Sequence, residues 1–216
     1  MGYNTILFDL DGTLTDPKEG ITKSVAHALR YFGIQVESLD SLTCFIGPPL
    51  TASFPEYYGL GEEETEIAVA KYRERFSAVG WAENVPYAGI GELLSALKTA
   101  GKKLLVATSK PEVFAVRILE HFGLASYFDL ICGAPMQAPK GHGKADVIRD
   151  ALERMGITEL SDVVMVGDRL HDVEGAHKIG LPCIGVLYGY GDREEMENCH
   201  ADYIAEDVAA LHGLLL

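Results

Sequence analysis

The stretch Thr5-Ile6-Leu7-Phe8-Asp9-Leu10-Asp11-Gly12-Thr13-Leu14-Thr15-Asp16 decides the fold class of this chain. Its first four residues form a short apolar run, which is typical of a parallel strand buried on both faces. Two aspartates, Asp9 and Asp11, follow where that strand ends, and Gly12 allows a tight turn. For two alternating acids alone, a strand-terminating turn is the ordinary structural explanation. The rest of the chain decides between that explanation and a chemical one.

Further short apolar runs follow along the chain, at Lys103–Ala107, Phe128–Cys132, Asp162–Val166 and Pro182–Leu187. Amphipathic patterns between them predict helices over Gly91–Ala100, Glu112–Phe122 and Lys144–Met155. Alternating strands and helices of this kind predict an α/β domain with a parallel sheet and right-handed crossovers.

One segment interrupts this alternation, because residues 16–83 show no convincing strand pattern. Apolar positions at helical spacing predict helices over Lys18–Phe32 and Glu62–Val79. Between them lies the apolar loop Phe45-Ile46-Gly47-Pro48-Pro49-Leu50. We therefore expect a core domain from residues 1–15 and 84–216, with residues 16–83 as a helical insert over the carboxyl edge of the sheet.

Composition and charge narrow the class of protein. The chain has 216 residues, 48% of them hydrophobic, and a net charge of −14, which repels nucleic acid polymers and anionic membranes. No apolar run reaches the roughly 18 residues that a membrane span requires, and no signal-peptide pattern is present at the start. The four cysteines are scattered and form no C-x-x-C pair, which argues against zinc and favours a reducing cytoplasm.

Three more predicted strands are followed by residues that could bind a phosphate group or a metal ion. In Val106–Pro111, the Thr108 hydroxyl and backbone N–H groups could hold an anion, with Pro111 at the first position of a helix. A lysine ahead of the next helix, Lys144 or its competitor Lys140, could neutralise a transferring phosphoryl group. Asp168 and Asp172, four residues apart after Gly167, suit a hard cation such as Mg²⁺, and Gly167 would let the backbone turn sharply.

Each of these signals also has an ordinary structural explanation when it is taken alone. A hydroxyl can simply cap a helix, a single lysine is usually a solvated surface residue, and an acid in a first helical turn is favoured by the helix dipole. The carboxyl ends of parallel strands, however, meet at one edge of an open sheet, where ligands bind. The combination therefore favours a phosphate-handling site over four unrelated structural residues.

With these motifs the chain resembles the haloacid dehalogenase superfamily of phosphotransferases. Asp9-Leu10-Asp11-Gly12-Thr13-Leu14 is similar to the first motif of that superfamily, Thr108 to the second, Lys144 or Lys140 to the third, and Gly167-Asp168 with Asp172 to the fourth. The resemblance covers essentially the whole chain. It implies a Rossmann-like parallel sheet core with the helical insert as a small cap. The dehalogenase members lack the second aspartate of the first motif, so Asp11 argues against that reaction.

The resemblance also implies roles for individual residues. Asp9 would be the nucleophile and a Mg²⁺ ligand, and Asp11 the general acid and base as well as a metal ligand through its main-chain carbonyl. Thr108 and Lys144 would hold the phosphoryl group, and Asp168 and Asp172 would complete the metal site. Substrate would also meet Ser109, Lys110 and, in the cap, Gly47.

Within the superfamily the chain looks most like phosphoglycolate phosphatases, on residues 45–50, 87–90 and 107–111. The form Gly167-Asp168-Arg169-Leu170-His171-Asp172 leans toward neighbouring bacterial 5′-nucleotidases. Two further alternatives are a phosphomutase similar to β-phosphoglucomutase and a non-catalytic regulatory protein on the same scaffold. The expected partner is a small phosphorylated metabolite, with the chain acting as a monomer or homodimer.

Overall fold

The computed structural model describes residues 2–137, 139 and 141–216. Its contacts divide the chain into two units. One unit combines residues 1–16 with 86–216, and the other comprises residues 17–85. The sequence predicted these junctions after residues 15 and 83.

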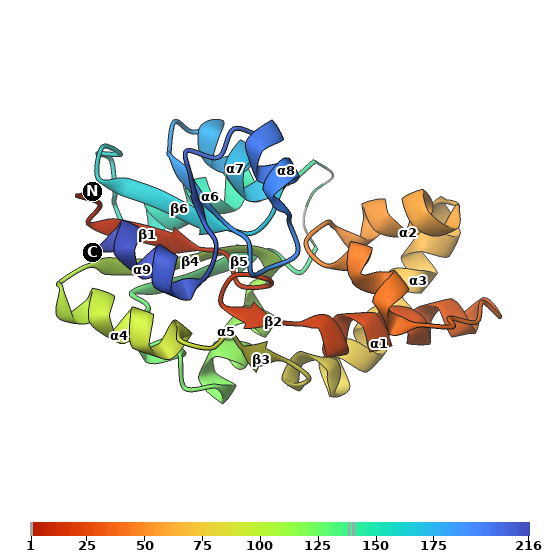
Figure 1. Cartoon of the computed structure of the whole chain (residues 1–216). Helices are drawn as coiled ribbons and strands as arrows, with labels where there is room; N and C mark the ends of the chain where they lie inside the picture. The colour runs from red at the N-terminus through yellow and green to blue at the C-terminus, as the bar shows by residue number, and fades with distance from the viewer. Residues whose placement is uncertain (1, 138, 140) are drawn as a thin grey trace. The chain divides into compact units, whose positions relative to one another are not determined.

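The first unit contains a six-stranded parallel sheet with the strand order β5-β4-β1-β6-β7-β8 (Figure 1). The strands are β1 (Thr5–Phe8), β4 (Lys103–Pro111), β5 (Leu130–Ala134), β6 (Val163–Gly167), β7 (Cys183–Val186) and β8 (Tyr203–Ala205). This confirms the predicted parallel-sheet α/β fold. The strand β1 lies between β4 and β6, so the residues that follow it reach the middle of the carboxyl edge.

Helices cover both faces of this sheet, with α6 and α7 on one face and α4 and α5 on the other (Figure 1). The helices of this unit are α4 (Ile90–Thr99), α5 (Glu112–His121), α6 (Lys144–Arg154), α7 (Leu170–His177), α8 (Arg193–Asn198) and α9 (Val208–Leu215), with a 3-10 turn η3 (Ala125–Tyr127). Side chains such as Leu7, Leu105, Ile148 and Met165 form a fully buried core between the sheet and α6. Burying apolar side chains in this way supplies most of the driving force for such a layered fold.

The short strands β2 (Thr15–Asp16) and β3 (Val85–Pro86) form a separate two-stranded sheet where the chain leaves and re-enters the first unit. The second unit contains α1 (Lys18–Tyr31), η1 (Leu39–Phe45), α2 (Leu50–Tyr58), α3 (Glu62–Ala78) and η2 (Gly80–Ala82). Tyr72 and Phe76 stack on one another in its core, with ring centroids 5.3 Å apart. A forked pair between Arg75 and Glu83, with N–O distances of 2.7 and 2.9 Å, joins α3 to the end of this unit.

The structure contains several elements that the sequence analysis did not predict, and one predicted strand is longer than expected. The strand β8 and the helix α2 were not predicted: β8 is only three residues long, and Pro55 inside α2 hides its helical pattern. The strand β4 continues to Pro111 instead of ending at Ala107.

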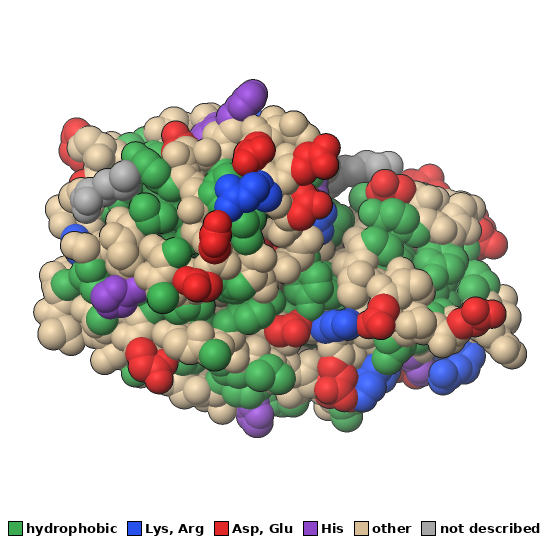
Figure 2. Space-filling model, in the orientation of Figure 1, with side chains coloured by type: hydrophobic (Ala, Val, Ile, Leu, Met, Phe, Trp, Pro, Cys, Tyr) green, Lys and Arg blue, Asp and Glu red, His purple; other side chains and the backbone are tan. Residues whose placement is uncertain are grey.

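Acidic side chains are spread over the face of the molecule that Figure 2 shows, with fewer basic side chains between them, in keeping with the negative net charge. Among the residues that the structure describes, no helix has both the length and the apolar character that crossing a membrane requires.

Candidate active site

Asp9 lies directly after β1, at the centre of the carboxyl edge of the sheet. Its backbone N–H donates a hydrogen bond to the carbonyl oxygen of Val166, at 2.9 Å, which extends the pairing of β1 with β6 by one residue. The side chain is only 10% exposed. Because the strands on both sides hold its backbone, the Asp9 carboxylate has a fixed position from which it can act on a bound group.

Lys144, the first residue of α6, reaches this carboxylate. Its Nζ atom lies 2.8 Å from Oδ1 of Asp9 and 2.6 Å from Oδ1 of Asp172, and it donates a hydrogen bond to the carbonyl oxygen of Ala107. Burial by itself lowers the pKa of Lys144, but the carboxylates of Asp172 and Asp9 outweigh burial and raise that pKa above its ordinary value. The predicted Lys144 is therefore a charged lysine in the site, whereas its competitor Lys140 lies outside the described residues.

Asp168 and Asp172 bring two more carboxylates to the same place. Asp168 follows β6, and Asp172 is in the first turn of α7, where its carboxylate also accepts the N–H of Arg169 at 3.1 Å. One oxygen from each of Asp9, Asp168 and Asp172 lies within 4.8 Å of the other two, and all three side chains are buried. Burial and the neighbouring acids raise the pKa of Asp168, and burial raises that of Asp172 to about 6 against the attraction of Lys144.

This group of carboxylates fits a divalent metal ion. Asp9, Asp168 and Asp172 gather three potential negative charges around the single ammonium of Lys144. Concentrated carboxylate oxygens of this kind are the ligands that Mg²⁺ and similar hard cations prefer. The carboxylate of Asp11 does not belong to this group, so its predicted contribution to the metal site rests on its main-chain carbonyl alone.

Two glycines make room for these acids. Gly12 has a φ of +82°, and a Cβ there would lie 2.0 Å from Oδ2 of Asp168, so both the backbone shape and the space exclude a side chain. Gly167 was predicted to allow a sharp turn. The structure gives a different reason, because a Cβ on Gly167 would lie 2.2 Å from Cγ of Asp172. Both positions let the backbone approach a carboxylate closely.

The second aspartate of the first motif has a different environment. The carboxylate of Asp11 forms an ion pair with Nζ of Lys110, at 2.6 Å, and both side chains are largely buried. Burial raises the pKa of Asp11 above its ordinary value, and the attraction of Lys110 opposes that shift without cancelling it. The sequence predicted Lys110 as a substrate contact and did not foresee this pair, because Asp11 lies in the turn after β1 and Lys110 lies in β4, far along the chain.

The hydroxyl residue of the second motif is buried inside β4. The Thr108 side chain is 1% exposed, and its hydroxyl oxygen accepts the backbone N–H of Lys110 at 3.2 Å. The prediction that Pro111 opens the helix is wrong: Pro111 ends β4 with a ψ of 130°, and α5 begins at Glu112. An irregularity in the pairing of β4 with β5 between Thr108 and Pro111 lets the strand continue past this point.

Ser109 and Gly47, both predicted to contact the substrate, belong to different units. Ser109 is half-buried next to Thr108 in β4. Gly47 belongs to the helical unit, in the loop between η1 and α2, with a φ of +104°. Its contact with a substrate stays a prediction.

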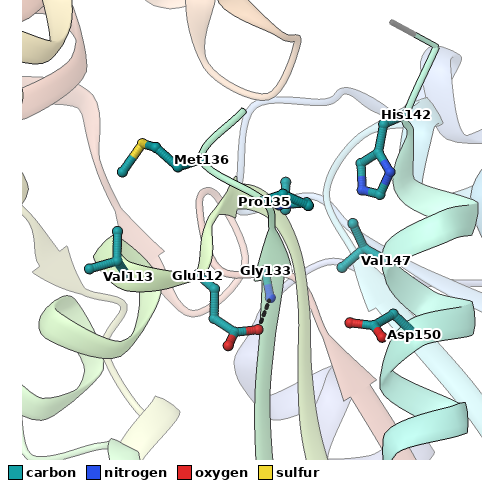
Figure 3. Close-up of a pocket in the computed structure, with 9 residues that line it drawn as sticks. Glu112, Val113, Gly133, Pro135, Met136, His142, Val147 and Asp150 are labelled. Atoms are coloured by element: carbon teal, nitrogen blue, oxygen red, sulfur yellow. Dashed lines mark hydrogen bonds between the residues drawn. The ribbon is translucent and has the colours of Figure 1, made fainter. Parts of the chain in front are cut away.

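A cavity of about 530 Å³ lies between the start of α5, the end of β5 and α6 (Figure 3). Figure 3 shows Glu112 accepting the backbone N–H of Gly133, at 3.1 Å, with Asp150 facing the same space from α6. None of the predicted site residues that the structure describes lines this cavity. The carboxylate group around Asp9 is therefore a separate feature of the unit.

Comparison with known proteins agrees with this arrangement. The profile of the family described as "Haloacid dehalogenase-like hydrolase" matches residues 6–186. A 5′-nucleotidase of Pseudomonas aeruginosa is 46% identical to the chain, covering 99% of it and 96% of the nucleotidase. A phosphoglycolate phosphatase of Agrobacterium fabrum is 35% identical, over 95% of this chain and 89% of that protein.

Two further matches concern a kinase and a solved structure. The chain is 46% identical to the tyrosine-protein kinase PtkA of Mycobacterium tuberculosis over 86% of its own length, and it spans only 62% of that kinase. The crystal structure of a predicted phosphatase from Clostridium acetobutylicum has 54% identity and a TM-score of 0.94, covering 99% of this chain and 98% of that one. The chain therefore belongs to the haloacid dehalogenase-like hydrolase family, among members that are named phosphatases.

Proposed function

We propose that this protein is a Mg²⁺-dependent phosphate-monoester hydrolase that works through an aspartyl phosphate on Asp9. The observation that carries the proposal is the placement of two acids with different partners. The Asp9 carboxylate forms an ion pair with Lys144 beside the other two clustered acids. The Asp11 carboxylate, two residues along the chain, forms an ion pair with Lys110 instead. This difference supports Asp9 as the group that attacks phosphorus and Asp11 as the group that transfers protons.

The reaction proceeds in two steps. In the first, an oxygen of Asp9 bonds to phosphorus while the bond to the leaving alcohol breaks, and Asp11 gives that alcohol a proton. In the second, Asp11 takes a proton from a water molecule, whose oxygen attacks the aspartyl phosphate and releases inorganic phosphate and free Asp9. The raised pKa of Asp11 favours the protonated form that the first step requires.

The remaining residues neutralise and orient the phosphoryl group. Lys144 supplies a buried positive charge beside the nucleophile, and Thr108 supplies a hydroxyl at the neighbouring strand. Asp9, Asp168 and Asp172, with the main-chain carbonyl of Asp11, would hold Mg²⁺. When it is bound, Mg²⁺ adds positive charge against the phosphoryl oxygens.

We propose further that residues 17–85 act as the cap that selects the leaving group, with Gly47, Ser109 and Lys110 contacting the substrate. The independent contacts of this helical unit support a cap. A cap of this kind excludes bulk water during the first step. The proposed partner is a small phosphorylated metabolite, with no role for nucleic acid polymers or membranes, and the proposed setting is a cytoplasmic monomer or homodimer. The four free cysteines support a reducing compartment.

The proposed substrate is 2-phosphoglycolate, on the residues that resemble phosphoglycolate phosphatases. Nucleoside 5′-monophosphates are the second candidate, because a 5′-nucleotidase is 46% identical over nearly the whole chain. A phosphomutase would instead return the phosphoryl group to a sugar, and a regulatory protein would bind metal without turnover.

A panel of phosphate compounds tests the proposal. The purified chain is assayed for phosphate release from 2-phosphoglycolate, nucleoside monophosphates, pyrophosphate and sugar phosphates, with Mg²⁺ and after chelation. We expect release from at least one monoester that stops on chelation and returns with Mg²⁺. A separate reaction with ATP and a tyrosine peptide measures kinase activity. No release from any monoester, or phosphate transfer to the peptide alone, would contradict the proposal.

A further inference from the structure

The loop between β7 and α8 carries two tyrosines that the proposed reaction does not use. It contains Leu187-Tyr188-Gly189-Tyr190-Gly191-Asp192 and lies in the same unit as the acids. Its partner is the turn formed by residues 11–16, which begins with Asp11 and ends where the chain leaves this unit. The contacts between loop and turn all lie within the first unit.

The two tyrosines hold this turn through their hydroxyl groups. The Tyr188 hydroxyl donates a hydrogen bond to the carbonyl oxygen of Thr13, at 3.1 Å. The Tyr190 hydroxyl donates a short hydrogen bond to the carboxylate of Asp16. The ring of Tyr87 packs against Tyr188 at a centroid distance of 5.0 Å, which fixes the direction of the Tyr188 side chain.

The backbone of the loop is tied to the metal-binding acids at the same time. The N–H of Tyr190 donates to Oδ2 of Asp168 at 2.8 Å. Gly189 lies so close that a Cβ there would be 2.3 Å from the carbonyl oxygen of Gly12 and 2.4 Å from Cβ of Asp168. The backbone of the loop therefore packs directly against the backbone of the turn at Gly12 and against the side chain of Asp168.

We propose that Tyr188 and Tyr190 are positioning residues that set where the Asp11 carboxyl stands relative to the leaving group. The proposal rests on the proposed function, because it assigns the effect to proton transfer by Asp11. The turn has Asp11 at one end, and the tyrosines fix it at Thr13 in its middle and at Asp16 at its far end. Removing either hydroxyl takes away one of the contacts that fix the turn, while the backbone hydrogen bonds of the turn to Leu10 and the bond from the Tyr190 N–H to Asp168 remain.

The test compares two classes of leaving group. An alkyl monoester needs a proton from Asp11 when its bond to phosphorus breaks, whereas an aryl phosphate such as p-nitrophenyl phosphate leaves with little help. The value of kcat/KM reports the steps up to loss of the leaving group. We expect Tyr190→Phe to lower kcat/KM for the alkyl substrate by roughly 10- to 100-fold, the range for residues that orient a reacting group. Its kcat/KM for the aryl substrate should change by less than about threefold, and Tyr188→Phe should follow the same pattern.

Controls separate this role from a general structural one. Tyr3→Phe also removes a tyrosine hydroxyl from the same unit, since Tyr3 neighbours Tyr203 at the amino ends of the strands, away from the acids. This variant should keep the wild-type rate on both substrates. The Mg²⁺ concentration for half-maximal activity should be unchanged in Tyr190→Phe, because the N–H bond to Asp168 remains. Equal losses on both substrates, a shifted Mg²⁺ requirement or no loss at all would overturn the proposal.

A double variant gives an independent check. In the Asp11→Asn background there is no proton carrier left to position, so adding Tyr190→Phe should change kcat/KM by less than about twofold. A further full loss in the double variant would mean that Tyr190 acts elsewhere and would overturn the proposal. If the wild-type chain hydrolyses no monoester, the proposed function itself fails, and that result is distinct from a failure of the positioning role.

Discussion

The α/β unit contains a group of buried charged side chains, whereas the ion pairs of the helical unit lie closer to solvent. In the α/β unit, Asp9, Lys144, Asp168 and Asp172 are each at most 7% exposed. In the helical unit, the side chains of the Arg75–Glu83 pair are 20% and 23% exposed, and other pairs are more open still. Buried charges cost free energy unless they are fully paired, whereas hydrated pairs cost and contribute little. The α/β unit therefore keeps a group of buried charges that costs free energy, as the proposed reaction at Asp9 would require.

Replacing Asp9, the proposed nucleophile among the buried charges of the α/β unit, should produce the largest effect. Asp9→Asn keeps the shape of the side chain and removes the attacking oxygen, so phosphate release should fall on the order of 10⁶-fold, as for the loss of other nucleophiles. The circular dichroism spectrum should remain that of the wild type. The matched change in the helical unit, Asp40→Asn, alters an exposed acid and should leave the rate unchanged. Full activity in Asp9→Asn would contradict the proposed role of Asp9 as the nucleophile.

Removing the proton carrier should have the next largest effect. Asp11→Asn should lower the rate with an alkyl monoester on the order of 10²–10⁴-fold, the usual contribution of a positioned acid and base. Initial rates at saturating substrate measure this loss. A wild-type rate would mean that another group carries the proton and that the Asp11–Lys110 pair is structural.

Lys144 tests the energetic side of the comparison. Lys144→Met leaves Asp9 and Asp172 buried without their cation, so the free energy of unfolding without added metal should fall by roughly 3–5 kcal/mol. Denaturant titration measures this change. Lys71→Met removes a partner of Glu74 at the surface of the helical unit and should change the free energy of unfolding far less, because solvent screens such a pair. Similar values for the two variants would show that burial does not distinguish the units.

The smallest effect is expected for the helical unit itself. Arg75 holds the pKa of Glu83 below its usual value, so Glu83→Gln should lower the free energy of unfolding by about 1 kcal/mol at neutral pH. Because the pKa of Glu83 is lower in the folded state, its contribution is present above the unfolded pKa. The contribution is lost as the pH falls through the folded pKa. Titrations at pH 7 and at strongly acidic pH should therefore show the difference between variant and wild type shrinking.

Much of the site could be predicted because its residues follow buried strands. The positions of Asp9 and Asp168 follow from short apolar runs that end at one edge of a parallel sheet, and the parallel pairing of β1 with β6 brings them together. Which lysine belongs to the site could not be predicted from the sequence, because the position of α6 in the fold brings Lys144 to Asp9. Spacing along the chain carries no information about such a contact.

The features that sequence reasoning missed depend on contacts between distant segments. Nothing near Lys110 in the sequence indicates that its ammonium meets Asp11 instead of open solvent. In the sequence, Tyr188 and Tyr190 have no distinguishing pattern. Only the fold shows that their hydroxyls bond to the turn after β1. The strand β8 was not predicted because its three residues are too few to show a periodic pattern of apolar side chains.

The central place of β1 has a consequence for how the chain folds. Thr5 pairs with Lys103 on one side and with Val163 on the other, so β1 has no partner in this sheet until segments about 100 and 160 residues later have been made. The helical unit, by contrast, is continuous in sequence and its contacts are local. Because long-range pairing slows folding, we expect α1 and α3 to pack early and the nucleophile to reach its final position late. A newly made chain would then acquire helical structure before it acquires any activity.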